Sequence, residues 1–165
     1  MDKYSLNACW GARRERVEEC ARHLLNYLMC LGQWDESCRT WYEKANSLEE
    51  ALQHKVMLNL ASLERLLLSG RQYTDVERRP IEELGYSVSI WNGRDTEEGD
   101  QGGIGMRLRC GCYSRLVPNV CEVKLPYQGP VAARMLQVSR LRELLKCVVR
   151  AWNPACVCAA EGGLS

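Results

Sequence analysis

The sequence predicts one α+β domain over residues 1–165, with helices packed on an antiparallel sheet of about four to five strands. Three observations indicate this fold. Apolar and polar residues alternate near the start of the chain and again in three segments after residue 85, which is the period of strands that bury one face. Two long segments instead repeat apolar residues every three or four positions, as amphipathic helices do. The three late strand segments follow one another directly, which favours an antiparallel meander.

The first half of the chain is expected to hold one strand and three helices. A strand covers residues 3–10, and a long amphipathic helix follows from about residue 13 to 31, where Gly32 ends it. The capping box Ser47-Leu48-Glu49-Glu50 begins a short helix, and Gly70 ends a third helix that starts near residue 60. Residues 40–42 form at most a short strand.

The second half is expected to hold the meander and one long helix. Pro130 suits a first helical turn, and Asn153-Pro154 stops the helix that it opens, so this helix spans about residues 131–152. Cys156 and its neighbours are expected to form one further short strand. The meander strands are predicted at 86–91, 105–113 and 120–125.

The charge balance excludes some classes of function. Lys and Arg number 22 against 21 Asp and Glu, so the net charge is +1. A protein that binds nucleic acid without sequence preference depends on excess cations, so direct nucleic-acid binding is not expected. No apolar run reaches the roughly 18–20 residues of a membrane-spanning helix. The first residues lack the basic-then-apolar layout of a secretory signal, which indicates a cytoplasmic protein without a membrane partner.

Nothing in the sequence indicates an enzyme or a cofactor. The chain has two histidines, His23 and His54, and neither sits in a nucleophile or metal-binding motif. The glycine-rich segment 99–105 lacks the following helix and the lysine of a phosphate-binding loop. We therefore expect a protein without catalytic residues.

Ten cysteines are unusual for a chain of this length. Several stand where a core residue belongs, so we expect mostly reduced, buried thiols that pack as small hydrophobes. Cysteines at such core positions are Cys20, Cys30, Cys121 and Cys147.

Two Cys-x-Cys pairs leave an alternative function open, a zinc- or redox-responsive module. Four thiolates could hold a tetrahedral zinc ion, although typical zinc knuckles have two residues between the cysteines. In an extended strand, Cys-x-Cys places both sulfurs on one face about 7 Å apart, which suits neighbouring packing positions better than chelation. The four residues are Cys110, Cys112, Cys156 and Cys158.

Charged residues cluster in two places. Residues 94–100 hold one arginine and four carboxylates, a net charge of −3. Such a segment is either a solvated loop or an acidic contact for a basic partner. The candidate partner-binding residues are Asp95, Glu97, Glu98 and Asp100, with Asp35 and Glu36 as a second acidic patch. The last helix is basic, and its cations are expected on a solvated outer face; they are Arg134, Arg140, Arg142, Lys146 and Arg150.

Several strings of the sequence are distinctive, and the longest is Ile81-Glu82-Glu83-Leu84-Gly85-Tyr86-Ser87-Val88-Ser89-Ile90-Trp91-Asn92-Gly93. Two others are Ala8-Cys9-Trp10-Gly11-Ala12-Arg13-Arg14-Glu15 and Trp152-Asn153-Pro154. Together these strings resemble immunity protein family fifty-two.

The resemblance implies a cytoplasmic antitoxin that neutralises one cognate toxin by direct binding, without cofactor or catalysis. In this family the partner is typically a nuclease effector with a restriction-endonuclease fold, often delivered by a type VI secretion system. Because the net charge is near zero, a local acidic contact fits better than mimicry of nucleic acid along the whole toxin cleft.

Overall fold

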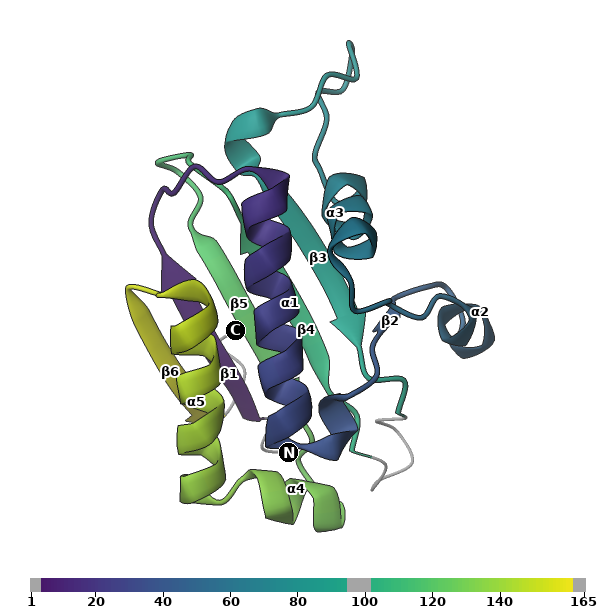
Figure 1. Cartoon of the computed structure of the whole chain (residues 1–165), viewed down its shortest axis with the longest axis vertical. Helices are drawn as coiled ribbons and strands as arrows, with labels where there is room; N and C mark the ends of the chain where they lie inside the picture. Colours follow the sequence, from purple (N-terminus) through teal and green to yellow (C-terminus); the bar gives the residue numbers. More distant parts are fainter. Residues whose placement is uncertain (1–3, 95–101, 162–165) are drawn as a thin grey trace.

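The computed structural model describes residues 4–94 and 102–161, which include one antiparallel sheet with helices on one of its faces (Figure 1). The strand order is β2-β3-β4-β5-β1-β6, and every neighbouring pair is antiparallel. The strands are β1 (Tyr4–Trp10), β2 (Tyr42–Glu43), β3 (Tyr86–Trp91), β4 (Gly105–Cys110), β5 (Asn119–Leu125) and β6 (Cys156–Glu161).

The α+β class and the antiparallel sheet are confirmed, but the sheet has six strands rather than four to five. The difference comes from β2, which has two residues and is too short to show an alternating pattern in the sequence. The short strand expected at Cys156 is present as β6, at the other edge of the sheet.

Three helices cover one face of the sheet, namely α1 (Val17–Trp34), α3 (Leu60–Ser69) and α5 (Val138–Trp152) (Figure 1). Side chains alternate along each strand, so Leu6, Ala8 and Trp10 of β1 are buried under these helices. Ser5, Asn7 and Cys9 lie on the opposite side, which we call the open face because none of the described helices covers it.

The long helices differ in two details from the sequence prediction. α1 continues through Gly32 to Trp34, whose buried ring and indole hydrogen bond to the carbonyl oxygen of Arg140 (2.8 Å) outweigh the cost of a glycine in a helix. The helix expected over residues 131–152 is two helices, α4 (Gly129–Met135) and α5, because Gln137 has an extended backbone.

The shorter helices lie at the periphery of the sheet. α2 (Leu48–Gln53) begins at Ser47, as the capping box predicts, and stands beside β2 (Figure 1). Two 3-10 helices complete the described elements, η1 (Glu36–Cys38) and η2 (Glu82–Leu84). None of the helices in the described residues is long and apolar enough to cross a membrane.

The structure explains why position 85, within the segment Ile81 to Gly93, is a glycine. Gly85 joins η2 to β3 with a φ of +63°, a conformation that side-chain-bearing residues rarely adopt. A Cβ at this position would lie 2.3 Å from the carbonyl oxygen of Cys110. Only glycine therefore lets the start of β3 pass this close to the end of β4.

Candidate partner-binding surface

Asn92 links three segments at the end of β3. Its side-chain nitrogen donates to the carbonyl oxygens of Ser37 (3.1 Å) and Gly102 (2.9 Å), and its side-chain oxygen accepts from the backbone N–H of Ile104 (2.9 Å). The residue is buried, so these bonds are protected from water. η1 and the described residues on either side of the acidic segment, Arg94 and Gly102, are therefore held at one place.

The acidic segment itself, with Asp95, Glu97, Glu98 and Asp100, lies outside the described residues. Its described neighbours are Arg94 and Gly102, at the ends that Asn92 positions. Glu36 is exposed in η1, whose Ser37 bonds to the same asparagine. The structure thus brings Glu36 to the base of the acidic segment, although about sixty residues separate them in the sequence.

Asp35 is placed differently from Glu36. Its carboxylate is buried and forms two hydrogen bonds with the guanidinium of Arg134, at 2.9 and 3.1 Å, and a third with Arg140 at 3.3 Å. It also caps η1 by accepting from the backbone N–H of Ser37 at 2.9 Å. Burial alone would raise the pKa of Asp35, but the bonds from Arg134 and Ser37 hold it below its ordinary value. The carboxylate therefore stays charged and binds groups of the protein itself, namely Arg134, Arg140 and the backbone of Ser37.

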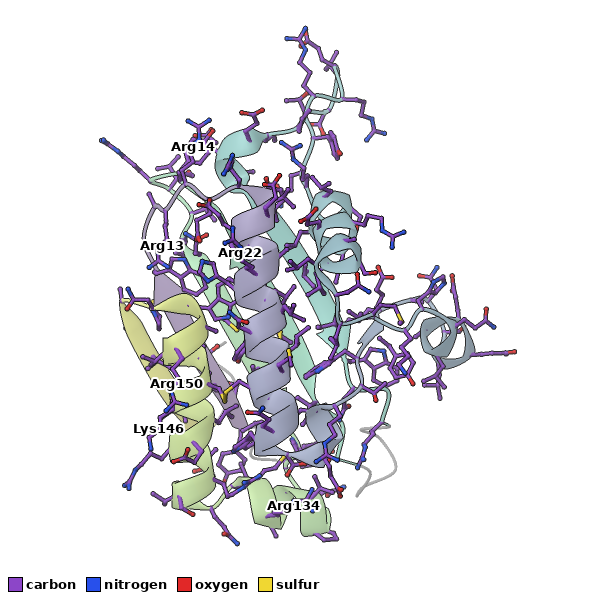
Figure 2. The ribbon with its side chains drawn as sticks, viewed as in Figure 1. Arg13, Arg14, Arg22, Arg134, Lys146 and Arg150 are labelled. Carbon is purple, nitrogen blue, oxygen red and sulfur yellow. A yellow bond between two sulfur atoms is a disulfide. The ribbon has the colours of Figure 1, made fainter. Side chains whose placement is uncertain are left out.

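Two of the cations expected on a solvated helix face are therefore structural. Arg134 projects from α4 beneath the C-terminal end of α1 (Figure 2), and Arg140 also donates to the carbonyl oxygen of Trp34. The break at Gln137 makes this arrangement, because it lets α4 and α5 approach the end of α1 from two directions. Lys146 and Arg150, by contrast, are exposed and project from α5 into solvent (Figure 2).

An exposed apolar segment lies at the β2 edge of the sheet, and we call it the apolar arm. Within 13 residues of chain, five large apolar side chains are 38% to 55% exposed, although such side chains are more stable when buried. In α2 itself, Ala51 is the buried residue. The exposed members are Leu48, Leu52, Met57, Leu58 and Leu60.

The backbone fixes the arm to the sheet edge. Val56 donates to the carbonyl oxygen of Trp41 at 2.8 Å, and Glu43 donates to that of His54 at 3.0 Å. Leu52 lies next to Gly93, where an added Cβ would be 3.3 Å from its Cδ2 atom. The arm is thus adjacent to the point where the chain leads into the acidic segment.

A polar hollow of about 340 Å³ is lined by residues of β2, of α2 and of the segment that joins them. Its walls carry both charges, so it is a wet depression beside the arm rather than an apolar binding pocket. The lining residues are Glu43, Lys44, Ala45, Asn46, Glu50 and His54.

Sequence reasoning did not identify the apolar arm. The capping box correctly predicts α2, but leucines at helical spacing are more typical of a buried face. No pattern in the sequence predicts that the sheet ends at β2 and leaves these side chains uncovered.

The two Cys-x-Cys pairs do not meet. Cys110 and Cys112 are buried, whereas Cys156 and Cys158 are exposed on β6, and β5 and β1 stand between β4 and β6. Within residues 4–94 and 102–161, no group of three or more His, Cys, Asp or Glu side chains could hold a metal ion. The zinc site and the module built on these two pairs are not supported.

The remaining thiols largely follow the prediction. Cys20 and Cys121 are buried core residues, and burial raises the pKa of the Cys121 thiol to about 12. Cys30 and Cys147 were expected to be reduced, but the structure joins them in a disulfide between α1 and α5. Their helices run side by side, which brings together two positions that the sequence separates by 117 residues.

The family model of immunity protein 52 matches residues 2–162, nearly the whole chain. No curated protein matches the chain significantly. An immunity protein family implies a cognate toxin as the partner, and it suggests a function without catalysis. The match covers every described helix and strand, and the chain belongs to the immunity protein 52 family.

Proposed function

We propose that this protein binds and neutralises a cognate nuclease toxin, an effector of a type VI secretion system, and so protects the cell that produces it. The family match over residues 2–162 carries the proposal, because it implies an immunity protein with a toxin partner. The toxin class rests on the resemblance of the sequence to antitoxins of restriction-endonuclease-fold effectors, TsiT of the TseT–TsiT pair among them. On this proposal the protein acts in the cytoplasm, where such a toxin would reach its substrate.

The apolar arm and the acidic segment form the proposed toxin-binding surface. Stable interfaces commonly have an apolar centre and a polar rim. The arm supplies the apolar centre, and Glu36 supplies part of an acidic rim. The chain runs from Arg94 into Asp95, Glu97, Glu98 and Asp100, which we propose as further acidic contacts for the toxin. Asp35 contributes from inside, since its ion pairs hold the turn that presents Glu36.

The charge distribution favours inhibition by local contact. An antitoxin requires no chemistry, only a rigid scaffold and a complementary patch of roughly 800 Å² per partner. A net charge of +1 does not suit mimicry of a whole nucleic-acid strand, but an acidic rim can steer a basic nuclease surface toward the arm.

The test is neutralisation of the toxin encoded beside this gene. Bacteria that express the toxin should stop growing, and co-expression of this protein should restore growth and yield a co-purified complex. In vitro, DNA cleavage by the purified toxin should fall to background near an equimolar ratio. Restored growth without a complex would contradict direct binding. A complex with a toxin that does not cleave nucleic acid would contradict the nuclease assignment.

A further inference from the structure

Three thiols share the open face of the sheet at the β1–β6 edge. Cys9 of β1 lies directly opposite Cys156 in the antiparallel register, and Cys158 lies opposite Asn7. Because same-face positions in a strand are two residues apart, Cys158 is the next residue of β6 on the side of Cys156. Cys156 and Cys158 are exposed, and Cys9 is half-buried.

Cys9 and Cys156 are in direct contact. Their sulfur atoms are 2.7 Å apart, and either thiol can donate the hydrogen bond. This bond is the main cause that raises the pKa of the Cys9 thiol, followed by burial and the charges of Cys156 and Cys158. Facing positions of neighbouring antiparallel strands bring their Cβ atoms close to the spacing of a disulfide, so bonding requires little movement of the backbone.

Exposure distinguishes this pair from another thiol pair of the protein. Cys20 and Cys110 also interact, but both are fully buried between α1 and the sheet. A small reagent in solution cannot reach them without opening the core. The pair on the open face is accessible to solvent through Cys156, and none of the described helices covers it.

We propose that Cys9 and Cys156 form a thiol–disulfide exchange site that reacts with small disulfides of the class of oxidised glutathione. The exposed Cys156 thiolate attacks one sulfur of the glutathione disulfide, which forms a mixed disulfide and releases one glutathione thiolate. The Cys9 thiolate then attacks the Cys156 sulfur and expels the second glutathione. The two cysteines are oxidised, the glutathione disulfide is reduced to two thiols, and these take up the two protons that the cysteines lose.

The product ties the edge strand β6 covalently to β1. This modification is independent of the proposed toxin-binding surface, because β6 and β2 are the two opposite edges of the sheet. Oxidation at Cys9 and Cys156 should therefore leave toxin binding unchanged, and the site can be tested without the toxin.

The experiment is disulfide mapping of the full chain after treatment with oxidised glutathione. Free thiols are blocked with N-ethylmaleimide in acid, and the protein is digested with trypsin. Cleavage after Lys3, Arg13 and Arg150 places Cys9 in peptide 4–13 and Cys156 with Cys158 in peptide 151–165. The expected product is these two peptides joined by a disulfide, with the loss of two hydrogen atoms and without bound glutathione.

Cys158→Ser is the matched control, because it changes an exposed thiol of the same strand and face. It should keep the joined peptides and form them within about twofold of the wild-type rate. Cys156→Ser should lose the joined peptides or form them at least about tenfold more slowly. The proposal is overturned if wild-type Cys9 remains labelled by N-ethylmaleimide, or if Cys158→Ser abolishes the link. The wild-type map needs no variant to fold.

Discussion

The helices α1 and α2 follow similar sequence rules but have opposite surroundings. In the first turn of each, a side chain accepts from a backbone N–H, Glu19 from Arg16 in α1 and Ser47 from Glu50 in α2. Each also carries leucines at helical spacing. α1 lies across the sheet and buries seven residues, whereas α2 stands beyond the β2 edge and buries one. An apolar pattern therefore predicts that one face of a helix will be buried against another surface. Only the tertiary structure shows whether that surface belongs to the same chain. In α1 the partner is the sheet, and for α2 we propose the toxin.

The strongest expected contrast concerns stability. Leu28 of α1 is fully buried, so Leu28→Ala should lower the free energy of unfolding by about 2–5 kcal/mol. Leu52→Ala in α2 should change it by less than about 0.5 kcal/mol, because Leu52 is 44% exposed. Urea denaturation of both variants measures this. Equal losses in the two variants would show that the apolar arm is part of the core.

The second contrast is between the neighbours Asp35 and Glu36. Asp35→Asn leaves two arginines without their buried counter-ion and should cost about 2 kcal/mol, while Glu36→Gln at an exposed position should cost less than about 0.5 kcal/mol. Because folding lowers the pKa of Asp35 from 3.8, its contribution is present above that value and is lost as the pH falls through the folded pKa.

Urea denaturation over a range of pH checks this prediction. The unfolding free energies of the wild type and Asp35→Asn should differ most at neutral pH and converge as the pH falls from about 4 through the folded pKa of Asp35. A difference that stays constant down to low pH would show that the charge of Asp35 is not what stabilises the turn.

The smallest expected effect concerns the acidic segment. Reversing two of its charges with Glu97→Lys and Glu98→Lys should slow association with the toxin by about three- to tenfold, mostly at low salt. The matched control reverses Glu82 and Glu83, which are exposed in η2 before the opposite end of β3. Stopped-flow association kinetics would measure both pairs. Equal slowing would mean that overall charge, rather than the acidic segment, steers the partner.

The sequence predicts most of the scaffold because local patterns determine it. Alternation locates β1, β3, β4 and β5, and the helical period locates α1 and α5. Neither Leu136 nor Gln137 is a glycine or a proline, so no helix-breaking residue in the sequence predicts the break between α4 and α5. The contacts that accompany it, from Arg134 and Arg140 to Asp35, span 99 and 105 residues of sequence.

The candidate surface was harder to predict for the same reason. The acidic residues stand out by charge, but their relation to Glu36 depends on Asn92, whose bonds to Ser37 and Gly102 are not visible in a pattern. The exposure of the apolar arm depends on where the sheet ends. The pairing of Cys9 with Cys156 likewise follows from the register of β1 and β6, which no spacing in the sequence reveals.

The most direct test of the central claim is the affinity of an arm variant for the cognate toxin, measured by titration calorimetry. Leu48→Ser with Leu52→Ser removes exposed apolar surface from the arm, and Val76→Ser with Leu116→Ser removes it from residues that are each 92% exposed elsewhere. We expect the arm variant to fold normally and to bind the toxin at least about tenfold more weakly, while the control binds like the wild type. Wild-type affinity in the folded arm variant would contradict the assignment of the toxin to the apolar arm.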